Sequence, residues 1–156
     1  MPVNPDEFRK ALGHFAVAVT VVTTRAEEQL AGITVTAFSS LSLTPPLVLV
    51  CIDGRAWLHE RLALGTSLAI NFLKEDQELV SRRFASGGPN QFDGIGYKLG
   101  ESGAPLLDGC LATLECRVVD RVAGGDHTIV VAEVLATSIS EDKPLLYFRG
   151  GYNRLA

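Results

Sequence analysis

Apolar and polar residues alternate along much of this chain with the two-residue period of β-strands. The clearest alternation spans residues 110–118, where the apolar side begins at Cys110 and ends at Val118. Other strand-like runs are rich in Val, Ile and Thr, and they cover residues 16–24, 30–37, 47–53, 67–73, 128–136 and 145–148. The pattern therefore predicts about seven strands.

Helical spacing is confined to short segments. Apolar residues recur at positions i, i+3, i+4 and i+7 in Phe8, Ala11, Leu12 and Phe15, after a capping sequence that begins at Asn4. We also predict helices over residues 56–64 and 77–85, and a long surface loop over the Gly-rich residues 86–105. Helices are too few for repeated βαβ units, so we expect one mainly β domain over residues 1–156, a β-barrel with short helices.

Composition narrows the range of partners and locations. The 156 residues carry a formal net charge of −4, which argues against nucleic acid or an anionic membrane as the main partner. No apolar run approaches the roughly 20 residues that span a bilayer, and no signal peptide is evident, so we expect a soluble protein. Cys51, Cys110 and Cys116 are odd in number and lack CxxC spacing, which favours a reducing cytoplasm over a disulfide framework.

Residues with small hydroxyl side chains are frequent between the apolar run that ends near Ile33 and the one that begins at Leu47. Between Ile33 and Ser42 they are Thr34, Thr36, Ser39, Ser40 and Ser42, and a Pro45-Pro46 break separates them from the apolar residues 47–52. Each hydroxyl can donate and accept a hydrogen bond, and the small side chains let backbone amides approach a ligand. We interpret residues 34–42 as a binding site for a flat polar ligand, and we call this segment the cradle.

Other motifs are informative mainly by exclusion. Neither G-x-G-x-x-G nor the phosphate-loop pattern occurs, and the three histidines lack metal-ligand spacing, so we expect no metal site. His127 follows Gly124-Gly125-Asp126 at the start of an apolar strand. From residue chemistry alone, His127 is either a ligand contact at a strand mouth or an ordinary residue after a glycine turn.

Four segments occur in an order that resembles the flavin reductase family with the FMN-binding split-barrel fold, the small reductase components of two-component flavin monooxygenases. They are Gly13–Thr24, Gly32–Asp53, Gly125–His127 and Gly150–Tyr152, which together extend over nearly the whole chain. The resemblance implies a reductase that passes a hydride from NADH or NADPH to FMN or FAD and uses no protein acid or base. It also implies a homodimer that supplies reduced flavin to a separate monooxygenase.

The resemblance further implies specific contacts. The flavin ring would lie against Thr34, Val35, Thr36, Ala37, Ser39, Ser40, Leu41 and Ser42. Cys51, Ile52 and Asp53 would line the ribityl and phosphate path, Phe84 and Ala85 would close the phosphate end, and His127 and Tyr152 would contact the nicotinamide nucleotide.

Two places depart from the family pattern. One is Ala18, where a glycine is usual in the first motif, a change that we expect to reshape packing without removing function, and the other is residues 54–58. Small hydroxyl residues usually follow the Cys-Ile-Asp segment, whereas this chain has Gly54-Arg55-Ala56-Trp57-Leu58. We expect Arg55 to replace the phosphate contact by charge, with Ala56 beside it, while Trp57 either stacks on the ligand or packs against the barrel. The alternatives to a reductase are a flavin-binding split barrel that does not react with nicotinamide, and a barrel without flavin.

Overall fold

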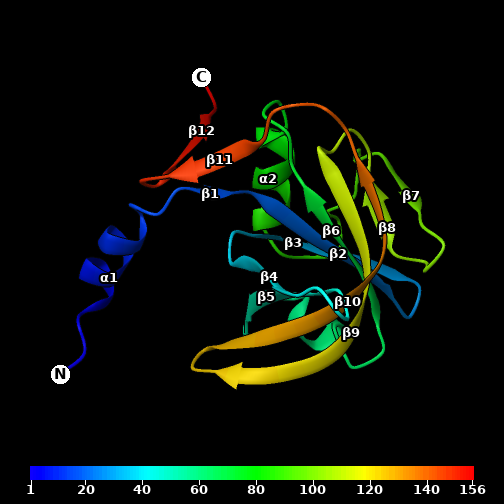
Figure 1. The fold of residues 1–156 in the computed structure, drawn as a ribbon, viewed down its shortest axis with the longest axis horizontal. Coiled ribbons are helices and arrows are strands. Elements are labelled where there is room, and N and C mark those ends of the chain that lie inside the picture. The colour runs from blue at the N-terminus through cyan, green and yellow to red at the C-terminus, as the bar shows by residue number, and fades with distance from the viewer.

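The computed structural model describes residues 1–156 and is built mainly from antiparallel strands (Figure 1). The main sheet has seven strands in the order β3, β2, β6, β9, β10, β5, β4. Their bounds are β2 Thr20–Ala26, β3 Gln29–Val35, β4 Phe38–Ser42, β5 Leu47–Asp53, β6 Ser67–Phe72, β9 Ala112–Gly124 and β10 His127–Ile139. The mainly β fold expected from the sequence is confirmed.

Two smaller sheets and three helices complete the fold. β1 (Val17–Ala18), β11 (Leu145–Phe148) and β12 (Gly151–Arg154) form one small sheet, and β7 (Tyr97–Leu99) and β8 (Pro105–Leu107) form the other. The helices are α1 (Pro5–Leu12), α2 (Glu78–Ala85) and the short 3₁₀ helix η1 (His59–Arg61). α1 stands apart from the sheets in Figure 1, and it contains no buried residue. None of the helices is long and apolar enough to cross a bilayer.

The main sheet curls around the largest of three buried clusters. This cluster of 14 buried residues includes Ala31 and Val35 from β3 and Val50 and Ile52 from β5, and Phe38 of β4 packs against it. Strands at opposite ends of the sheet therefore face the same interior, as in a barrel. The hydrogen-bonded order begins at β3 and ends at β4, so the barrel stays open between these two edges.

The two edges of the main sheet differ in what covers them. α2 packs against β3, where the Thr34 hydroxyl donates to the Ser81 carbonyl at 2.6 Å. The backbone N–H of Gly32 donates to the Gln91 side chain at 3.2 Å. A Cβ atom at Gly32 would lie 2.7 Å from the Phe84 ring, so only glycine allows this close packing. β4 has β5 on one side and no strand on the other.

Several predicted elements differ from the structure. The helix predicted over residues 56–64 is only the 3₁₀ turn His59–Arg61, because its apolar spacing comes from Leu58 and Leu62, which are buried in the core. The predicted loop 86–105 contains β7 and runs into β8. Residues 38–42 and 151–154 form strands that were not predicted as such, and β9 extends past Val118 to Gly124.

Candidate functional site

A groove of about 980 Å³ opens beside the free edge of the main sheet. One wall is the α1 face that carries Phe8 and Leu12, with Phe15 just beyond the helix. The opposite wall contains Thr36 and Ser39, which the sequence placed in the flavin cradle. The rest of the wall is mainly apolar, so the groove suits a flat aromatic molecule with a polar edge.

Strand alternation explains why these residues share one surface. Leu49 and Cys51 of β5 line the groove, and Asp53 continues the same face because residues two apart on a strand point the same way. Directly across the ladders, Ser39 pairs with Leu49 and His127 pairs with Asp53. The intervening residues of β5 point into the core, namely Val48, Val50 and Ile52. The sheet therefore carries the cradle and His127 on the same face.

Charged and polar groups gather where this face ends, at residues 53–55 and in the turn at residues 124–127. We call this region the mouth of the groove. The Asp53 carboxylate accepts from the Arg55 backbone N–H at 2.8 Å and from the Arg55 guanidinium at 2.9 Å. The side-chain hydrogen bond from Arg55, followed by its backbone N–H, holds the pKa of Asp53 well below its usual range. The same ion pair raises the pKa of Arg55. Asp53 is thus an anion at neutral pH, paired with an exposed guanidinium.

The β9–β10 turn forms the other side of this mouth. Gly125 occupies the turn with a φ of 65°, in the left-handed region that glycine tolerates best. The Gly54 backbone N–H donates to the Asp126 carbonyl at 2.9 Å, which joins the turn to the end of β5. The Asp126 carboxylate lies 2.7 Å from His127 Nδ1, so it orients the imidazole and leaves Nε2 for a ligand.

Other predicted residues lie outside the groove. Val35, Ile52 and Phe84 are buried in the core, so any ligand contact from them must come from the backbone. The Trp57 ring is half-buried and packs against the core, and the Arg61 guanidinium lies 3.7 Å above its centre. Of the two roles left open for Trp57, the structure shows the packing role. Ala56 packs against the same core.

Five further predicted residues do not line the groove. Ser40 and Leu41 are exposed on β4, followed by the half-buried Ser42. Ala85 is exposed at the end of α2. The Tyr152 hydroxyl is 2.7 Å from Ser81 Oγ, and its ring packs edge-on against Tyr147, which does line the groove.

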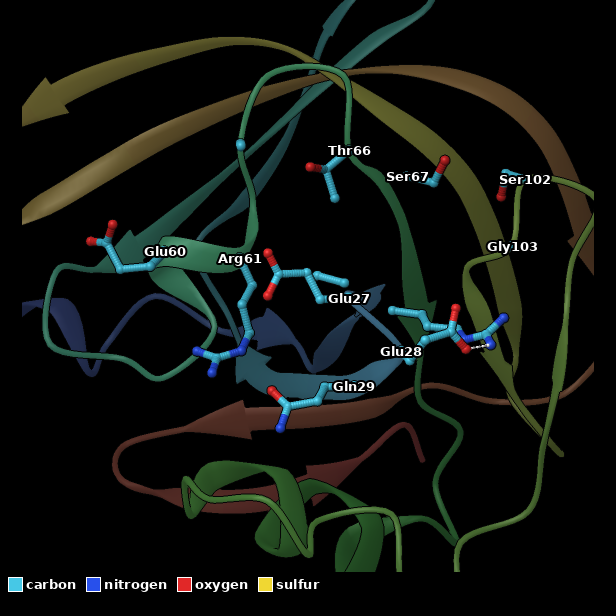
Figure 2. Close-up of a pocket in the computed structure, with 12 residues that line it drawn as sticks. Glu27, Glu28, Gln29, Glu60, Arg61, Thr66, Ser67, Ser102 and Gly103 are labelled. Carbon is cyan, nitrogen blue, oxygen red and sulfur yellow. Dashed lines mark hydrogen bonds and ion pairs between the residues drawn. The ribbon is translucent and has the colours of Figure 1, made fainter.

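A second cavity, of about 700 Å³, lies at the turn between β2 and β3 (Figure 2). Its walls carry the carboxylates of Glu27, Glu28 and Glu60, with the Arg61 side chain between them. β2 runs from Thr20 at the groove to Ala26 at this cavity, a span of about 20 Å at the rise of a strand. None of the predicted site residues lines the second cavity.

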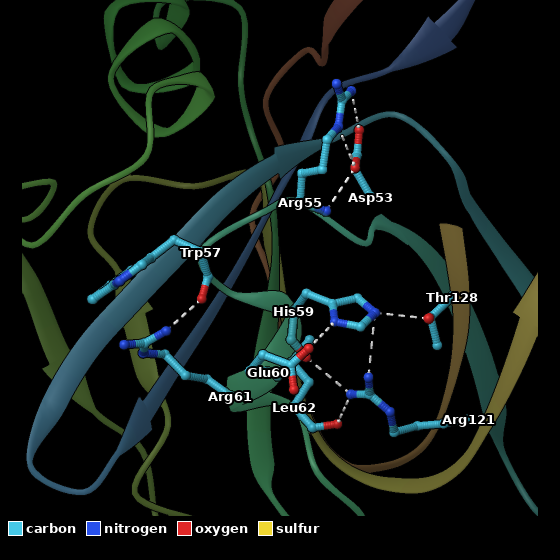
Figure 3. A network of polar contacts seen from close by, with 9 residues as sticks. All are labelled: Asp53, Arg55, Trp57, His59, Glu60, Arg61, Leu62, Arg121 and Thr128. Carbon is cyan, nitrogen blue, oxygen red and sulfur yellow. Dashed lines mark hydrogen bonds and ion pairs between the residues drawn. The ribbon is translucent and has the colours of Figure 1, made fainter. Parts of the chain in front are cut away.

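Sequence reasoning missed the part of the groove contributed by α1 and the small sheet. Phe8, Leu12, Val17, Tyr147 and Gly150 line the groove but were not among the predicted contacts. The available signal was the apolar stripe of the N-terminal helix, which has no buried residue to account for it. The hydrogen bonds of His59 and Arg121 behind the mouth (Figure 3) were also missed, because their partners are about 60 to 70 residues away in the sequence.

A curved, open antiparallel sheet with a mainly apolar groove at its free edge defines the class of fold. Within that class, residues 12–156 match the family described as Flavin reductase like domain. The chain is 39% identical over 151 residues to the reductase component of 4-nitrophenol 4-monooxygenase/4-nitrocatechol 2-monooxygenase from Rhodococcus opacus, covering 97% of this chain and 81% of that protein. The chain belongs to the flavin reductase family, as the sequence motifs indicated.

Further relatives agree in sequence and in structure. An NADH-dependent FAD reductase from Streptomyces globisporus is 40% identical over 161 residues, covering 99% of this chain and 88% of that protein. The solved NADH:FAD oxidoreductase from Streptomyces globisporus C-1027, in complex with NAD and FAD fragments, superposes with a TM-score of 0.92 at 39% identity. That match covers 100% of this chain and 97% of the solved chain.

Proposed function

We propose that this protein is a flavin reductase that transfers a hydride from NADH to FMN or FAD. The observation that carries the proposal is the hydroxyl-rich free edge of β4 beside an apolar groove, with His127 at the end of the same face. The family membership supports it, as do the relatives named NADH-dependent FAD reductase and FMN reductase (NADH).

The residues of the groove fit a flavin. Every second backbone N–H and C=O of an edge strand points away from its neighbour, so β4 has groups free to bind the polar edge of the ring. Thr36 and Ser39 add hydroxyls, while Leu49 and Phe72 supply apolar walls that exclude water. Arg55 at the mouth offers a cation for the flavin phosphate, although it shares its charge with Asp53.

Bound flavin would supply the hydride acceptor, so this chain needs to bind and orient its ligands and needs no acid or base of its own. We assign nicotinamide binding to His127, whose ring Asp126 already orients, and propose Tyr152 of β12 as a second contact. Phe84 and Ala85 would contribute through their backbone at the phosphate end.

A steady-state matrix of NADH and NADPH against FMN, FAD and riboflavin tests the activity. We expect nicotinamide absorbance to fall rapidly when free flavin is added to the pure protein with NADH. Absence of oxidation with every flavin would refute a reductase, and bound flavin that stays oxidised would instead indicate a flavin-binding protein. The His127→Ala variant should weaken nicotinamide binding and spare flavin binding, whereas equal losses would contradict the role of His127.

We also propose a homodimer that covers the α1 face. Phe8, Leu12 and Phe15 are 54%, 57% and 74% exposed, and their removal from water would drive association. We expect Leu12→Glu to shift the sedimentation of the protein from dimer to monomer. Leu79→Glu is the matched control, since Leu79 is the same residue type and is even more exposed, at 81%, but lies outside the groove on α2. A monomeric wild-type protein would contradict this proposal.

The reduced flavin has to be consumed by another protein, and we propose a separate flavin-dependent monooxygenase. Relatives described as reductase components or subunits of monooxygenases support this assignment. We place the protein in the cytoplasm, because all three of its cysteines are unpaired. An oxygenase assay that is driven by this protein and NADH, and that stops when either is omitted, would test the coupling.

A further inference from the structure

A largely buried imidazole joins the two turns that form the mouth of the groove (Figure 3). His59 belongs to η1, which follows the turn that carries Arg55. Its Nε2 atom lies 2.8 Å from the hydroxyl of Thr128, the residue next to His127 on β10. The His59 side chain is 14% exposed, so water competes little for this contact. The imidazole therefore ties η1 to the start of β10.

Arg121 of β9 also holds η1. Its guanidinium donates to the His59 carbonyl at 3.1 Å and also to the Leu62 carbonyl. Carbonyls at the end of a helical turn have no partner within the turn, and a guanidinium satisfies them. The Arg121 Nη2 atom is also 3.4 Å from His59 Nε2. The side chain of Arg121 thus uses its donors to fix η1 against the sheet.

These contacts determine the tautomer of His59. A guanidinium only donates hydrogen bonds, so the Nε2 atom that faces Arg121 and Thr128 is the acceptor. The ring proton is then on Nδ1, which is 2.9 Å from the carboxylate of Glu60. Each ring nitrogen therefore has a partner suited to the neutral imidazole.

We propose that His59 is a positioning residue that fixes the separation between Arg55 and His127 and thereby sets how nicotinamide meets the groove. The β5–β10 ladder, which pairs Asp53 with His127, and the Gly54 N–H to Asp126 carbonyl bond, at 2.9 Å, hold the end of β5 against the start of β10. The His59–Thr128 contact extends this attachment to η1, beyond the turn that carries Arg55. This inference rests on the proposed reductase function, because it assigns His127 to nicotinamide.

Two variants of His59 separate positioning from simple loss of stability. His59→Leu keeps the volume and removes both nitrogens, and we expect the KM for NADH to rise about tenfold, the effect of one lost hydrogen bond. The dissociation constant for flavin, from quenching of flavin fluorescence, should stay unchanged. His59→Gln places an amide oxygen near the position of Nε2, so it should restore most of the NADH affinity. Hydrogen exchange at the Gly54 amide should quicken in His59→Leu alone.

Thr113→Val is the matched control, because the Thr113 hydroxyl is hydrogen-bonded to the Ser138 hydroxyl at 2.8 Å. This contact joins β9 and β10 at the end far from His127. The variant should lower stability without moving the KM for NADH or the exchange at Gly54. If His59→Leu changes KM no more than this control does, or changes flavin and NADH affinity equally, the positioning role is overturned. A wild-type protein that does not oxidise NADH with any flavin would overturn the proposed function itself. If the wild-type protein is active and His59→Leu has the same KM for NADH, only this inference is overturned.

Discussion

The main sheet ends in two strands, β3 and β4, that have the same hydrogen-bonding capacity and use it differently. β3 is covered by α2 and by Gln91, whose side chain accepts from Gly32 and donates to the Ser86 carbonyl. β4 is uncovered, and its central residues are exposed. An open sheet edge is normally shielded because it invites unwanted pairing. One edge of this sheet is therefore used for stability, and the other remains available for a ligand.

The difference also shows in the side chains. Thr34 and Thr36 are two residues apart on the same stretch of chain. The Thr34 hydroxyl is bonded to α2, whereas Thr36 lies exposed in the groove. A hydroxyl-rich segment is thus divided into a structural part and a binding part by what packs over it.

The largest effect expected from this comparison is at Phe84, which covers the β3 edge. Its ring is fully buried and packs edge-on against Phe92 at 5.0 Å. Phe84→Ala should lower the free energy of unfolding by about 3–5 kcal/mol, as measured by urea denaturation. Leu41→Ala on the exposed β4 is the matched control and should change stability by less than about 0.5 kcal/mol. Similar losses at both positions would mean that the two edges are equally covered.

A smaller loss is expected at Gln91, which is 4% exposed. Gln91→Leu removes the acceptor of the Gly32 N–H and leaves that donor buried without a partner. We expect a loss of about 1–3 kcal/mol in the free energy of unfolding. Hydrogen exchange at the Gly32 amide should become faster, and unchanged exchange would show that Gln91 does not protect this edge. Ser39→Ala removes only a local bond to the Ser40 carbonyl on β4, so its stability should match that of the wild type.

The comparison also explains which parts of the fold could be predicted from the sequence. β5 was predicted with its observed bounds, residues 47–53, because a strand buried on one face and flanked by turns has a strong pattern. β4 was not predicted, since an exposed edge strand made of Ser and Leu has no apolar alternation to reveal it. The helix at residues 56–64 was wrong because Leu58 and Leu62 pack into the core from an irregular turn.

The candidate site was predictable to a similar extent. Ser39, Cys51, Asp53 and His127 were proposed from their motifs, and the ladder pairing places them on one face. The wall from α1 and the His59–Thr128 contact depend on packing between segments far apart in the chain, which periodicity does not report.

The two threonines offer a sharper test of the comparison. Thr34→Val should lower the free energy of unfolding by about 1 kcal/mol, through loss of the bond to Ser81, and leave flavin affinity unchanged. Thr36→Val should leave stability unchanged and weaken flavin binding by up to about tenfold, measured by fluorescence quenching. The opposite assignment of effects would show that flavin binds on the α2 side of the chain.

The smallest effect is expected at the mouth, where Arg55 and Asp53 pair in the open. Their side-chain hydrogen bond holds the pKa of Asp53 below the ordinary value of 3.8, so the unfolded chain binds the proton more readily than the folded one. The pair therefore stabilises the fold above that pH, and its contribution is lost as the pH falls below it. We expect Arg55→Gln to be slightly less stable than the wild type above about pH 5, with the difference shrinking in acid.

Thermal unfolding of both proteins across this range measures the difference. Arg55→Lys should fall between them, because it keeps the charge and loses the two-point geometry. A difference that stays constant into acid would show that Arg55 acts by packing and not through the Asp53 carboxylate. In that case, Arg55 would be free to offer its full charge to a phosphate at the open edge.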